Sequence, residues 1–274
     1  MTSTIGSLQR QSALDPLDNR VLLCHALGVN RIALITQSER ELTEEEAQRF
    51  AALVQRRLDG EPIAYIVGQR EFFGLPFDVS SAVLIPRPDT ELLVELTLER
   101  TPRNGRVLDM GTGSGAIAVS VAHTRQDADV TALDVSADAL AVAQRNAANN
   151  NARVSFLQSD WYGALQGAAE ADAFDVIASN PPYIASGDHH LSEGDLRFEP
   201  VGALTDHADG LSALRTIIAG AQPHLKPQGW LLMEHGYDQA QAVRELLKAA
   251  GYSEVQSWQD LAGIERVSGG KLPG

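Results

Sequence analysis

Residues 107–115 read Val-Leu-Asp-Met-Gly-Thr-Gly-Ser-Gly, a short apolar run that ends in a glycine-rich turn. Such a run is typical of a parallel strand buried on both faces, and residues 116–122 predict the helix that follows it. Glycines let the backbone turn sharply and let a ligand approach without a Cβ in the way. The turn alone is a weak signal, because dehydrogenases use similar loops and tight packing also selects glycine. In its context it favours a nucleotide-like ligand at the end of this strand.

The alternation of strand and helix continues along the rest of the chain. Further apolar runs predict strands at 130–135, 154–157, 174–178, 230–233, 255–258 and 266–267. Helical spacing is found between them at 137–149, 211–221 and 239–250. This order predicts an α/β fold with a Rossmann-like, doubly wound sheet, whose ligands bind at the carboxyl ends of the strands.

Acidic and aromatic residues follow the next two strands. Asp134 lies about twenty residues after the glycine turn, where a carboxylate can accept hydrogen bonds from both ribose hydroxyls of an adenosine cofactor. Asp160 and Trp161 follow the third strand and suit an adenine amino group and the face of the base. The alternatives are an exposed acid at a strand end for Asp134 and a core position for Trp161.

The fourth strand leads into Ser-Asn-Pro-Pro-Tyr at residues 179–183, and this stretch indicates the reaction. Its two prolines fix the backbone and remove amide donors, which leaves carbonyl oxygens that only accept hydrogen bonds. The side-chain oxygen of Asn180 and the carbonyl of Pro181 can each take one N–H of a planar NH2 group. The ring of Tyr183 can hold that group and tolerate positive charge. A plain Asn-Pro-Pro turn is the alternative.

The amino-terminal part has a different pattern. Residues 15–60 have helical spacing, and Thr43 with Glu46 forms a capping-box pattern, so we expect a small helical domain. Residues 68–88, rich in glycine, proline and aromatics, predict a hairpin-like connector with β-prone pieces at 77–79 and 82–85. The only cysteine, Cys24, lies in an apolar helical stretch and is predicted to be a buried structural thiol.

Composition narrows the class of protein. A formal net charge of -14 and the absence of a basic stripe disfavour direct binding to nucleic acid. Neither a signal-peptide pattern nor an apolar run of about 18 residues is present, so we expect a soluble, cytoplasmic protein without membrane contact. His189 and His190 have no second pair at metal-binding spacing, and no metal site is predicted.

The Asn-Pro-Pro-Tyr motif and the glycine turn together resemble those of the class I amino-methyltransferases. More closely, the chain resembles the HemK/PrmC family, the release factor glutamine methyltransferases. The resemblance spans nearly the whole chain, because it extends to residues 60–65, 70–72, 84–91, 197–200 and 234–236. Residues 264–274 depart from it: they are poor in the β-branched residues expected of a final edge strand, which argues against the last predicted strand.

The resemblance implies a class I S-adenosylmethionine-dependent methyltransferase. Its expected parts are a helical substrate-recognition domain at 1–70, a hairpin connector at 71–90 and a catalytic domain at 91–274. The implied reaction methylates the side-chain amide of the glutamine in the Gly-Gly-Gln tip of class 1 peptide-chain release factors, giving N5-methylglutamine. The residues implied to contact the cofactor are Gly111, Thr112, Gly113, Ser114, Gly115, Asp134, Trp161 and Asn180. Those implied to receive the glutamine are Asn180, Pro181, Pro182 and Tyr183, of which Asn180, Pro181 and Tyr183 are expected to be catalytic.

Other functions share parts of this pattern. A glutamine methyltransferase of a ribosomal protein has both motifs, and the match of the amino-terminal domain favours release factors over it. A nucleic-acid adenine amino-methylase presents similar geometry to an NH2 group, but the acidity of the chain opposes it. A binding module without activity is opposed by the complete acceptor motif.

Two further features have no settled role. Arg87 lies in a rigid Pro-Arg-Pro setting, and either faces the cofactor carboxylate or the substrate loop or is an ordinary surface arginine. Residues 187–198 are polar and contain glycine, and we expect them to form a flap over the acceptor pocket.

Overall fold

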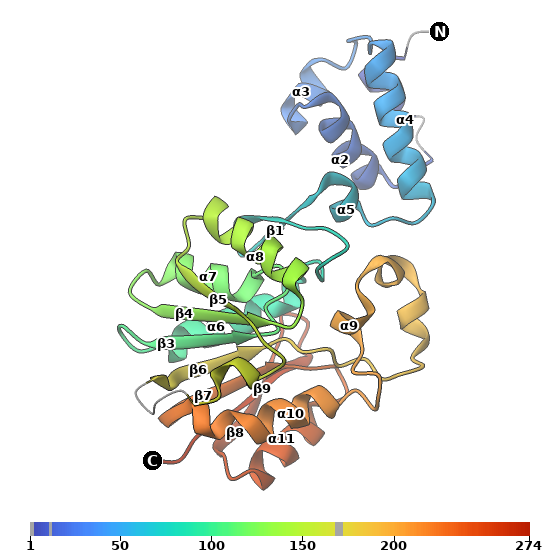
Figure 1. Ribbon diagram of the computed structural model, residues 1–274. Helices are drawn as coiled ribbons and strands as arrows, with labels where there is room; N and C mark the ends of the chain where they lie inside the picture. The colour runs from blue at the N-terminus through green and yellow to red at the C-terminus, as the bar shows by residue number, and fades with distance from the viewer. Residues whose placement is uncertain (1–2, 11–12, 168–171) are drawn as a thin grey trace. The chain divides into compact units, whose positions relative to one another are not determined.

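The computed structural model describes residues 3–10, 13–167 and 172–274 (Figure 1). The chain divides into two compact units, Met1–Gln69 and Arg70–Gly274. In the part of the chain that the structure describes, no helix has the length and apolarity needed to cross a lipid bilayer.

The first unit is helical, as expected. Its helices are α1 (Ile5–Arg10), α2 (Pro16–Leu27), α3 (Arg31–Thr36), α4 (Glu44–Leu58) and α5 (Ile63–Val67). The predicted capping box is present at the start of α4, where Thr43 accepts from the Glu46 amide and the Glu46 carboxylate accepts from the Thr43 amide. Buried residues such as Leu22, Leu23 and Phe50 form a core of the unit's own. Cys24 is only partly buried, although its side chain packs against this core as predicted.

The predicted hairpin follows the helices and is formed by β1 (Gln69–Phe72) and β2 (Leu75–Asp78). Its turn is made by Phe73 and Gly74, which both have positive φ. The β-prone piece at 82–85 forms no strand, so that prediction was wrong. The backbone there is held by a side chain instead, because the Ile85 amide donates to the buried carboxylate of Glu199 at 3.0 Å.

The buried side chain of Asn146 ties the hairpin to the rest of the unit. Its oxygen accepts from the Asp78 amide at 2.7 Å, and its nitrogen donates to the Asp78 carbonyl at 3.0 Å. The same nitrogen donates to the carbonyl of Ser114, in the glycine-rich turn, at 2.8 Å. One amide group therefore fixes the hairpin and the turn to a common helix.

A seven-stranded sheet forms the centre of this unit, in the order β5-β4-β3-β6-β7-β9-β8. The strands are β3 (Arg106–Met110), β4 (Asp129–Asp134), β5 (Val154–Gln158), β6 (Phe174–Ser179), β7 (Leu225–Glu234), β8 (Ser253–Gln259) and β9 (Glu265–Lys271). The pairs among β3 to β7 are parallel, and those of β9 with β7 and β8 are antiparallel. The strands at 107–110, 130–135, 154–157, 174–178 and 230–233 are thus confirmed.

Helices cover both faces of the sheet, which is the doubly wound arrangement expected from the sequence (Figure 1). The helices are α6 (Glu91–Arg100), α7 (Ala116–Thr124), α8 (Ala137–Asn149), α9 (Val201–Leu204), α10 (Ser212–Ala221) and α11 (Ala240–Ala249). Short 3-10 turns lie at η1 (Pro88–Thr90), η2 (Gly163–Leu165), η4 (His189–Ser192), η5 (Gly194–Phe198) and η6 (Gln222–His224). Val107 of β3 joins the core with α6, α7 and α8, whereas its neighbour Leu108 joins the core with α10 and α11.

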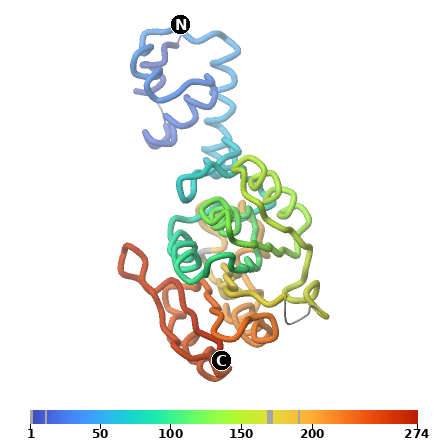
Figure 2. Tube along the Cα trace, turned by 90° about the vertical axis from the view of Figure 1, so that its left-hand side faces the viewer, coloured from blue at the N-terminus to red at the C-terminus, as the bar shows by residue number. Residues whose placement is uncertain are grey.

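The last strand corrects an expectation. β9 exists, and it lies inside the sheet between β7 and β8 rather than at an edge. Figure 2 shows the β8–β9 hairpin in red, with its turn projecting from the unit. Glycine is needed here because a Cβ on Gly269 would lie 2.5 Å from the Leu231 carbonyl oxygen. Pairing on both sides stabilises a strand that β-branched residues could not build at this spacing.

Candidate active site

A cavity of about 420 Å³ opens at the carboxyl ends of β3, β4, β5 and β6. Its walls come from the glycine turn, from the ends of three further strands, from the segment before α6 and from α9. Of the predicted site residues, the structure brings together here Gly111, Thr112, Gly113, Ser114, Asp134, Trp161, Asn180, Pro181 and Pro182. Gly115 and Tyr183 are not among the lining residues. The cavity thus lies at the place where open α/β sheets bind ligands.

The glycine turn is fixed by strand β4. The amides of Gly111 and Thr112 both donate to the Leu133 carbonyl, at 2.9 and 2.8 Å. Gly111 and Gly113 have positive φ, and a Cβ built on either meets nothing within 4 Å. Their backbone therefore faces open space, as a ligand's close approach requires. Gly115 has a different role: a Cβ there would lie 3.1 Å from the Ala143 Cβ, so this glycine lets α7 pack against α8.

The carboxylate of Asp134 accepts hydrogen bonds from two backbone amides. Its Oδ2 accepts from Gly113 at 2.8 Å, and its Oδ1 accepts from Ser136 at 2.9 Å. Each carboxylate oxygen accepts more than one hydrogen bond, so both can still receive a hydroxyl from the cavity that they line.

Asp109 lies in the strand that precedes the glycine turn, and its side chain is a further part of the site. The side chain is completely buried, and this burial raises the pKa of its carboxyl to about 7. Its Oδ2 accepts from the Thr112 hydroxyl at 2.5 Å and from the Ala118 amide at 3.1 Å. Asp109 therefore connects the end of β3, the glycine turn and the first turn of α7. A carboxylate inside an otherwise apolar strand was the signal in the sequence.

Asp160 and Trp161 line the cavity, as the sequence pattern suggested. Trp161 has a φ of +47°, and its carbonyl accepts from the Ser159 hydroxyl at 2.7 Å. The indole also packs against the core that contains α10 and α11. The Trp161 side chain is therefore both a cavity residue and part of the core.

Asn180 lies at the end of β6, with its amide oriented by a neighbour. Its Nδ2 donates to the hydroxyl of Thr90 at 3.2 Å, and Thr90 is buried and also lines the cavity. Among the described residues, no side chain or backbone amide donates a hydrogen bond to Oδ1 of Asn180. The oxygen is therefore the end of this amide that remains to accept a hydrogen bond.

Tyr183 lies behind the cavity wall. Its hydroxyl donates to Oε1 of the buried Glu234 at 3.3 Å. Burial first, and the nearby carboxylate second, raise the pKa of Tyr183 well above its ordinary value of 10. The phenol therefore stays protonated and donates.

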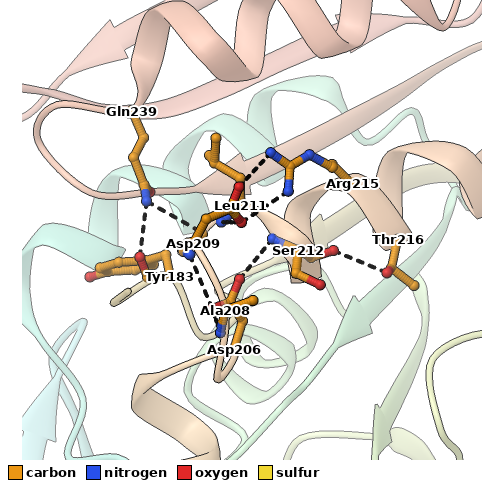
Figure 3. A network of polar contacts seen from close by, with 10 residues as sticks. Tyr183, Asp206, Ala208, Asp209, Leu211, Ser212, Arg215, Thr216 and Gln239 are labelled. Atoms are coloured by element: carbon orange, nitrogen blue, oxygen red, sulfur yellow. Dashed lines mark hydrogen bonds and ion pairs between the residues drawn. The ribbon is translucent and has the colours of Figure 1, made fainter. Parts of the chain in front are cut away.

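The backbone of Tyr183 is fixed by a polar network that Figure 3 shows from close by. Nε2 of Gln239 donates to the Tyr183 carbonyl at 2.9 Å and to the Gly210 carbonyl at 3.2 Å. The Gly210 amide in turn donates to Asp206, whose carboxylate also accepts from Ala208 and Ser212. A Cβ on Gly210 would lie 2.6 Å from the Tyr183 carbonyl oxygen, so glycine permits this approach. No sequence signal pointed to Gln239.

Arg87 lines the cavity and forms an ion pair with Glu199. Glu199 is 4% exposed and also accepts from the Ile85 amide, so this pair joins two walls of the cavity. The predicted flap, residues 187–198, contains η4 and η5, and none of its side chains that the structure describes lines the cavity. Its closure stays a prediction.

Known proteins resemble this chain throughout its length. Residues 4–68 match the model of the PrmC N-terminal domain, and residues 87–194 match that of the methyltransferase small domain. A release factor glutamine methyltransferase of Burkholderia pseudomallei is 56% identical over 280 residues, covering 99% of this chain and 97% of the relative. The chain belongs to the release factor glutamine methyltransferase family. A relative of the same name from Neisseria gonorrhoeae is 51% identical, covering 95% of this chain and 94% of its own length.

Membership in this family makes the chain a methyltransferase, which confirms the predicted enzyme class. Solved structures agree on the fold. A methyltransferase from Pyrococcus furiosus superposes with a TM-score of 0.56 at 24% identity, covering 80% of this chain and 98% of that one. A 16S rRNA N2 G1207 methyltransferase from T. Thermophilus, in complex with AdoMet and guanosine, has a TM-score of 0.51 at 22% identity, covering 74% and 49%.

Proposed function

We propose that the chain transfers a methyl group from S-adenosylmethionine to the side-chain amide nitrogen of the glutamine in the Gly-Gly-Gln tip of class 1 release factors. The names of its relatives support this substrate. The observation that carries the proposal is the orientation of Asn180, whose nitrogen is engaged by Thr90 while its oxygen is left to accept. This is the polarity that a substrate NH2 group requires.

The cavity fits the cofactor. The open backbone at Gly111 and Gly113 supports close approach of a ligand, and Asp134 lines the same cavity, where we propose that it binds the ribose. Asp160 and Trp161 suit the adenine. We propose that Thr112 and Ser114 line the same site, and that Gly115 contributes by letting α7 approach α8.

When bound, S-adenosylmethionine supplies an electrophilic methyl group on a sulfonium. The task of the protein is to make a weak nucleophile reactive, because the lone pair of an amide nitrogen is delocalised into its carbonyl. Asn180 Oδ1 and the Pro181 carbonyl accept the two N–H bonds and raise the electron density on nitrogen. Pro182 and Tyr183 fix the backbone that presents these acceptors. The nitrogen would gain the methyl as the S–CH3 bond of the sulfonium breaks to leave a neutral thioether. It would then lose one proton to water, so no strong base is required.

We further propose the roles of the chain's parts: residues 1–70 hold the release factor, 71–90 form the connector and 91–274 carry out transfer. The proposed substrate acts in translation, which would place the enzyme in the cytoplasm. The net charge of -14 supports a protein partner rather than direct binding to nucleic acid.

Mass spectrometry of a Gly-Gly-Gln peptide tests the proposal. An unmethylated release factor is mixed with the purified protein and labelled S-adenosylmethionine, and the peptide is analysed for an added methyl on glutamine. We expect one methyl there, and a rate lowered about 100-fold or more in Asn180→Ala, because one of the two polarising acceptors is lost. Cofactor affinity, measured by calorimetry, should stay within about tenfold.

Other outcomes identify what is wrong. Label on a ribosomal protein or on adenine would retain the chemistry and overturn the substrate. Equal rates for the wild type and Asn180→Ala would overturn the acceptor site. Binding of the cofactor without transfer to any of these substrates would favour a binding module.

A further inference from the structure

One wall of the cavity is built from two segments that the proposed chemistry has not used, residues 82–86 and residues 200–203. The second segment includes most of α9. Only alanine, valine, leucine, proline and glycine residues of these segments line the cavity. None of these residue types has a side-chain donor or acceptor of hydrogen bonds. The surface that they form, the apolar wall, therefore differs from the glycine turn and from Asn180, which present polar groups to the same cavity.

A buried carboxylate joins the two segments of the apolar wall. Glu199 directly precedes the second segment, and its Oε2 accepts from the Ile85 amide of the first segment at 3.0 Å. Its Oε1 forms the ion pair with Arg87, at the end of the first segment. The apolar wall is therefore one built surface rather than two independent loops.

The apolar wall lies at the acceptor end of the cavity. Ile184, the residue after the acceptor motif, donates its amide to the Leu204 carbonyl of α9 at 3.0 Å and forms a parallel bridge with Thr205. The residues proposed to hold the adenine and the ribose follow β5 and β4, which lie on the far side of β3 from β6. A cofactor that extends from β5 toward β6 therefore brings its methyl end to Asn180, and the apolar wall lies beyond it.

The chemistry of the apolar wall limits what can lie against it. The side chain of glutamine is short, so the neighbouring residues of the substrate must come up to the wall when the amide reaches Asn180. A polar or charged side chain loses its water there and gains no partner, which is unfavourable, whereas glycine brings no side chain at all. Space is limited as well, because the cavity of about 420 Å³ has to hold both the cofactor and the acceptor.

Gly202 marks the place where the apolar wall is open. It lies in α9, and a Cβ built on it meets nothing within 4 Å. A larger side chain can therefore be added without a clash inside the protein, next to the cavity that Gly202 lines. The neighbouring Val201 is 58% exposed and does not line the cavity. The two positions form a matched pair on one helix.

We propose that the apolar wall is the subsite for the residues that flank the acceptor glutamine, and that it selects a glutamine preceded by glycine. The space beside Gly202 is the space that the substrate chain occupies, so Gly202 is a specificity-determining position of this subsite. This inference rests on the proposed function, because that function places the glutamine at Asn180.

The first test compares Gly202→Phe with Val201→Phe, which introduces the same ring at the exposed neighbouring position. We expect kcat/KM for a release factor to fall about 30-fold or more in Gly202→Phe, and to stay within about threefold of the wild type in Val201→Phe. The affinity for S-adenosylhomocysteine, measured by calorimetry, should stay within about threefold in both variants, because the wall lies beyond the cofactor.

Two results of this comparison would overturn the inference. If Gly202→Phe lost as much affinity for S-adenosylhomocysteine as it lost transfer, the wall would belong to the cofactor site. If its transfer were unchanged, the wall would not contact the substrate.

A second test changes the substrate and leaves the enzyme intact. In the release factor, the glycine directly before the glutamine is replaced by alanine in one variant and by valine in another. We expect kcat/KM of the wild-type enzyme to fall from glycine to alanine to valine, by about tenfold or more between alanine and valine, because the wall discriminates by size. Equal kcat/KM for the alanine and valine variants would contradict the inference. A lack of transfer to the unaltered release factor would overturn the proposed function itself, and the inference with it.

Discussion

The carboxyl of Asp109 shows how a buried acid in the site affects stability. Its pKa is raised to about 7 by burial, from an ordinary value of 3.8. Between these values the folded protein holds a proton that the unfolded chain has released. Its contribution to the free energy of unfolding is therefore complete below about pH 4 and is lost as the pH rises through about 7. Glu234 has the same sign, because its pKa is also raised to about 7.

Replacing Asp109 with asparagine should flatten this pH dependence. In the wild type, Asp109 should make the free energy of unfolding decrease by up to about 1.4 kcal/mol per pH unit between pH 5 and 7. We expect Asp109→Asn to lack this contribution to the slope. Urea titrations at pH 5, 6 and 7 measure the slopes. Asp127→Asn is the control, since the pKa of the exposed Asp127 is lowered by Arg125 and its titration lies below this interval. Parallel slopes for wild type and Asp109→Asn would contradict the prediction.

Gln239 offers a prediction about the backbone of the acceptor motif. Gln239→Leu preserves the approximate volume and removes the donor to the Tyr183 and Gly210 carbonyls. Two carbonyls lose their partner, so we expect a transfer rate about tenfold lower, with KM for the cofactor unchanged. Gln241→Leu in the first turn of α11 is the matched control, because Gln241 is exposed and, among the described residues, its side chain donates to Glu245 alone. Equal rates for these two variants would show that Gln239 does not position Tyr183.

Much of the candidate site was predictable from residue types alone. The acceptor motif and the glycine turn follow strands, and strand ends in a parallel sheet meet at one edge, so Asn180 and Asp134 were placed correctly at the cavity. The partners of these residues were not predictable. Thr90 lies far from Asn180 in sequence, and Glu234 lies far from Tyr183, so only the folded sheet brings each pair together. The catalytic and binding roles themselves stay predictions.

At the scale of elements, β9 shows a limit of composition as a guide. Residues 265–271 contain two glycines where β-branched residues are usual, and this argued against a strand. A central strand is stabilised by ladders on both sides, and close packing against β7 and β8 excludes side chains at Gly269 and Gly270. The strands β3 to β6 could be predicted from their apolar sequences alone, because a strand buried on both faces requires apolar side chains on both.

Gly269→Ala tests this explanation. The new Cβ would lie 2.5 Å from the Leu231 carbonyl oxygen, which is backbone and does not rotate away. We expect the free energy of unfolding to fall by about 2–3 kcal/mol, as in other overpacked sites. Gly163→Ala is the control, since its Cβ would meet only the Ser159 hydroxyl at 3.8 Å. Denaturant titration measures both, and equal effects would refute the role given to Gly269.

For the whole molecule, each unit has its own core. The cluster around Leu22 and Phe50 lies within residues 1–69, and the two clusters of the sheet lie within 70–274. A chain of residues 70–274 should therefore fold and bind S-adenosylhomocysteine within about threefold of the full-length affinity. It should lose roughly tenfold or more in kcat/KM for a release factor, because the proposed holding domain is gone. Calorimetry and the transfer assay measure the two quantities, and an unchanged kcat/KM would remove the helical unit from substrate binding.

The position of β9 also has a consequence for how the protein is made. β7 pairs on one side with β9, which is synthesised last, after β8. That side of the β7 backbone is therefore still unpaired when β7 emerges from the ribosome. The 37 residues from 235 to 271 must follow before that side is closed, which takes roughly 2–7 s at ordinary speeds of synthesis. During this interval β7 has a row of unpaired backbone N–H and C=O groups that can pair with other chains, and a chaperone that shields this edge would raise the yield of active enzyme.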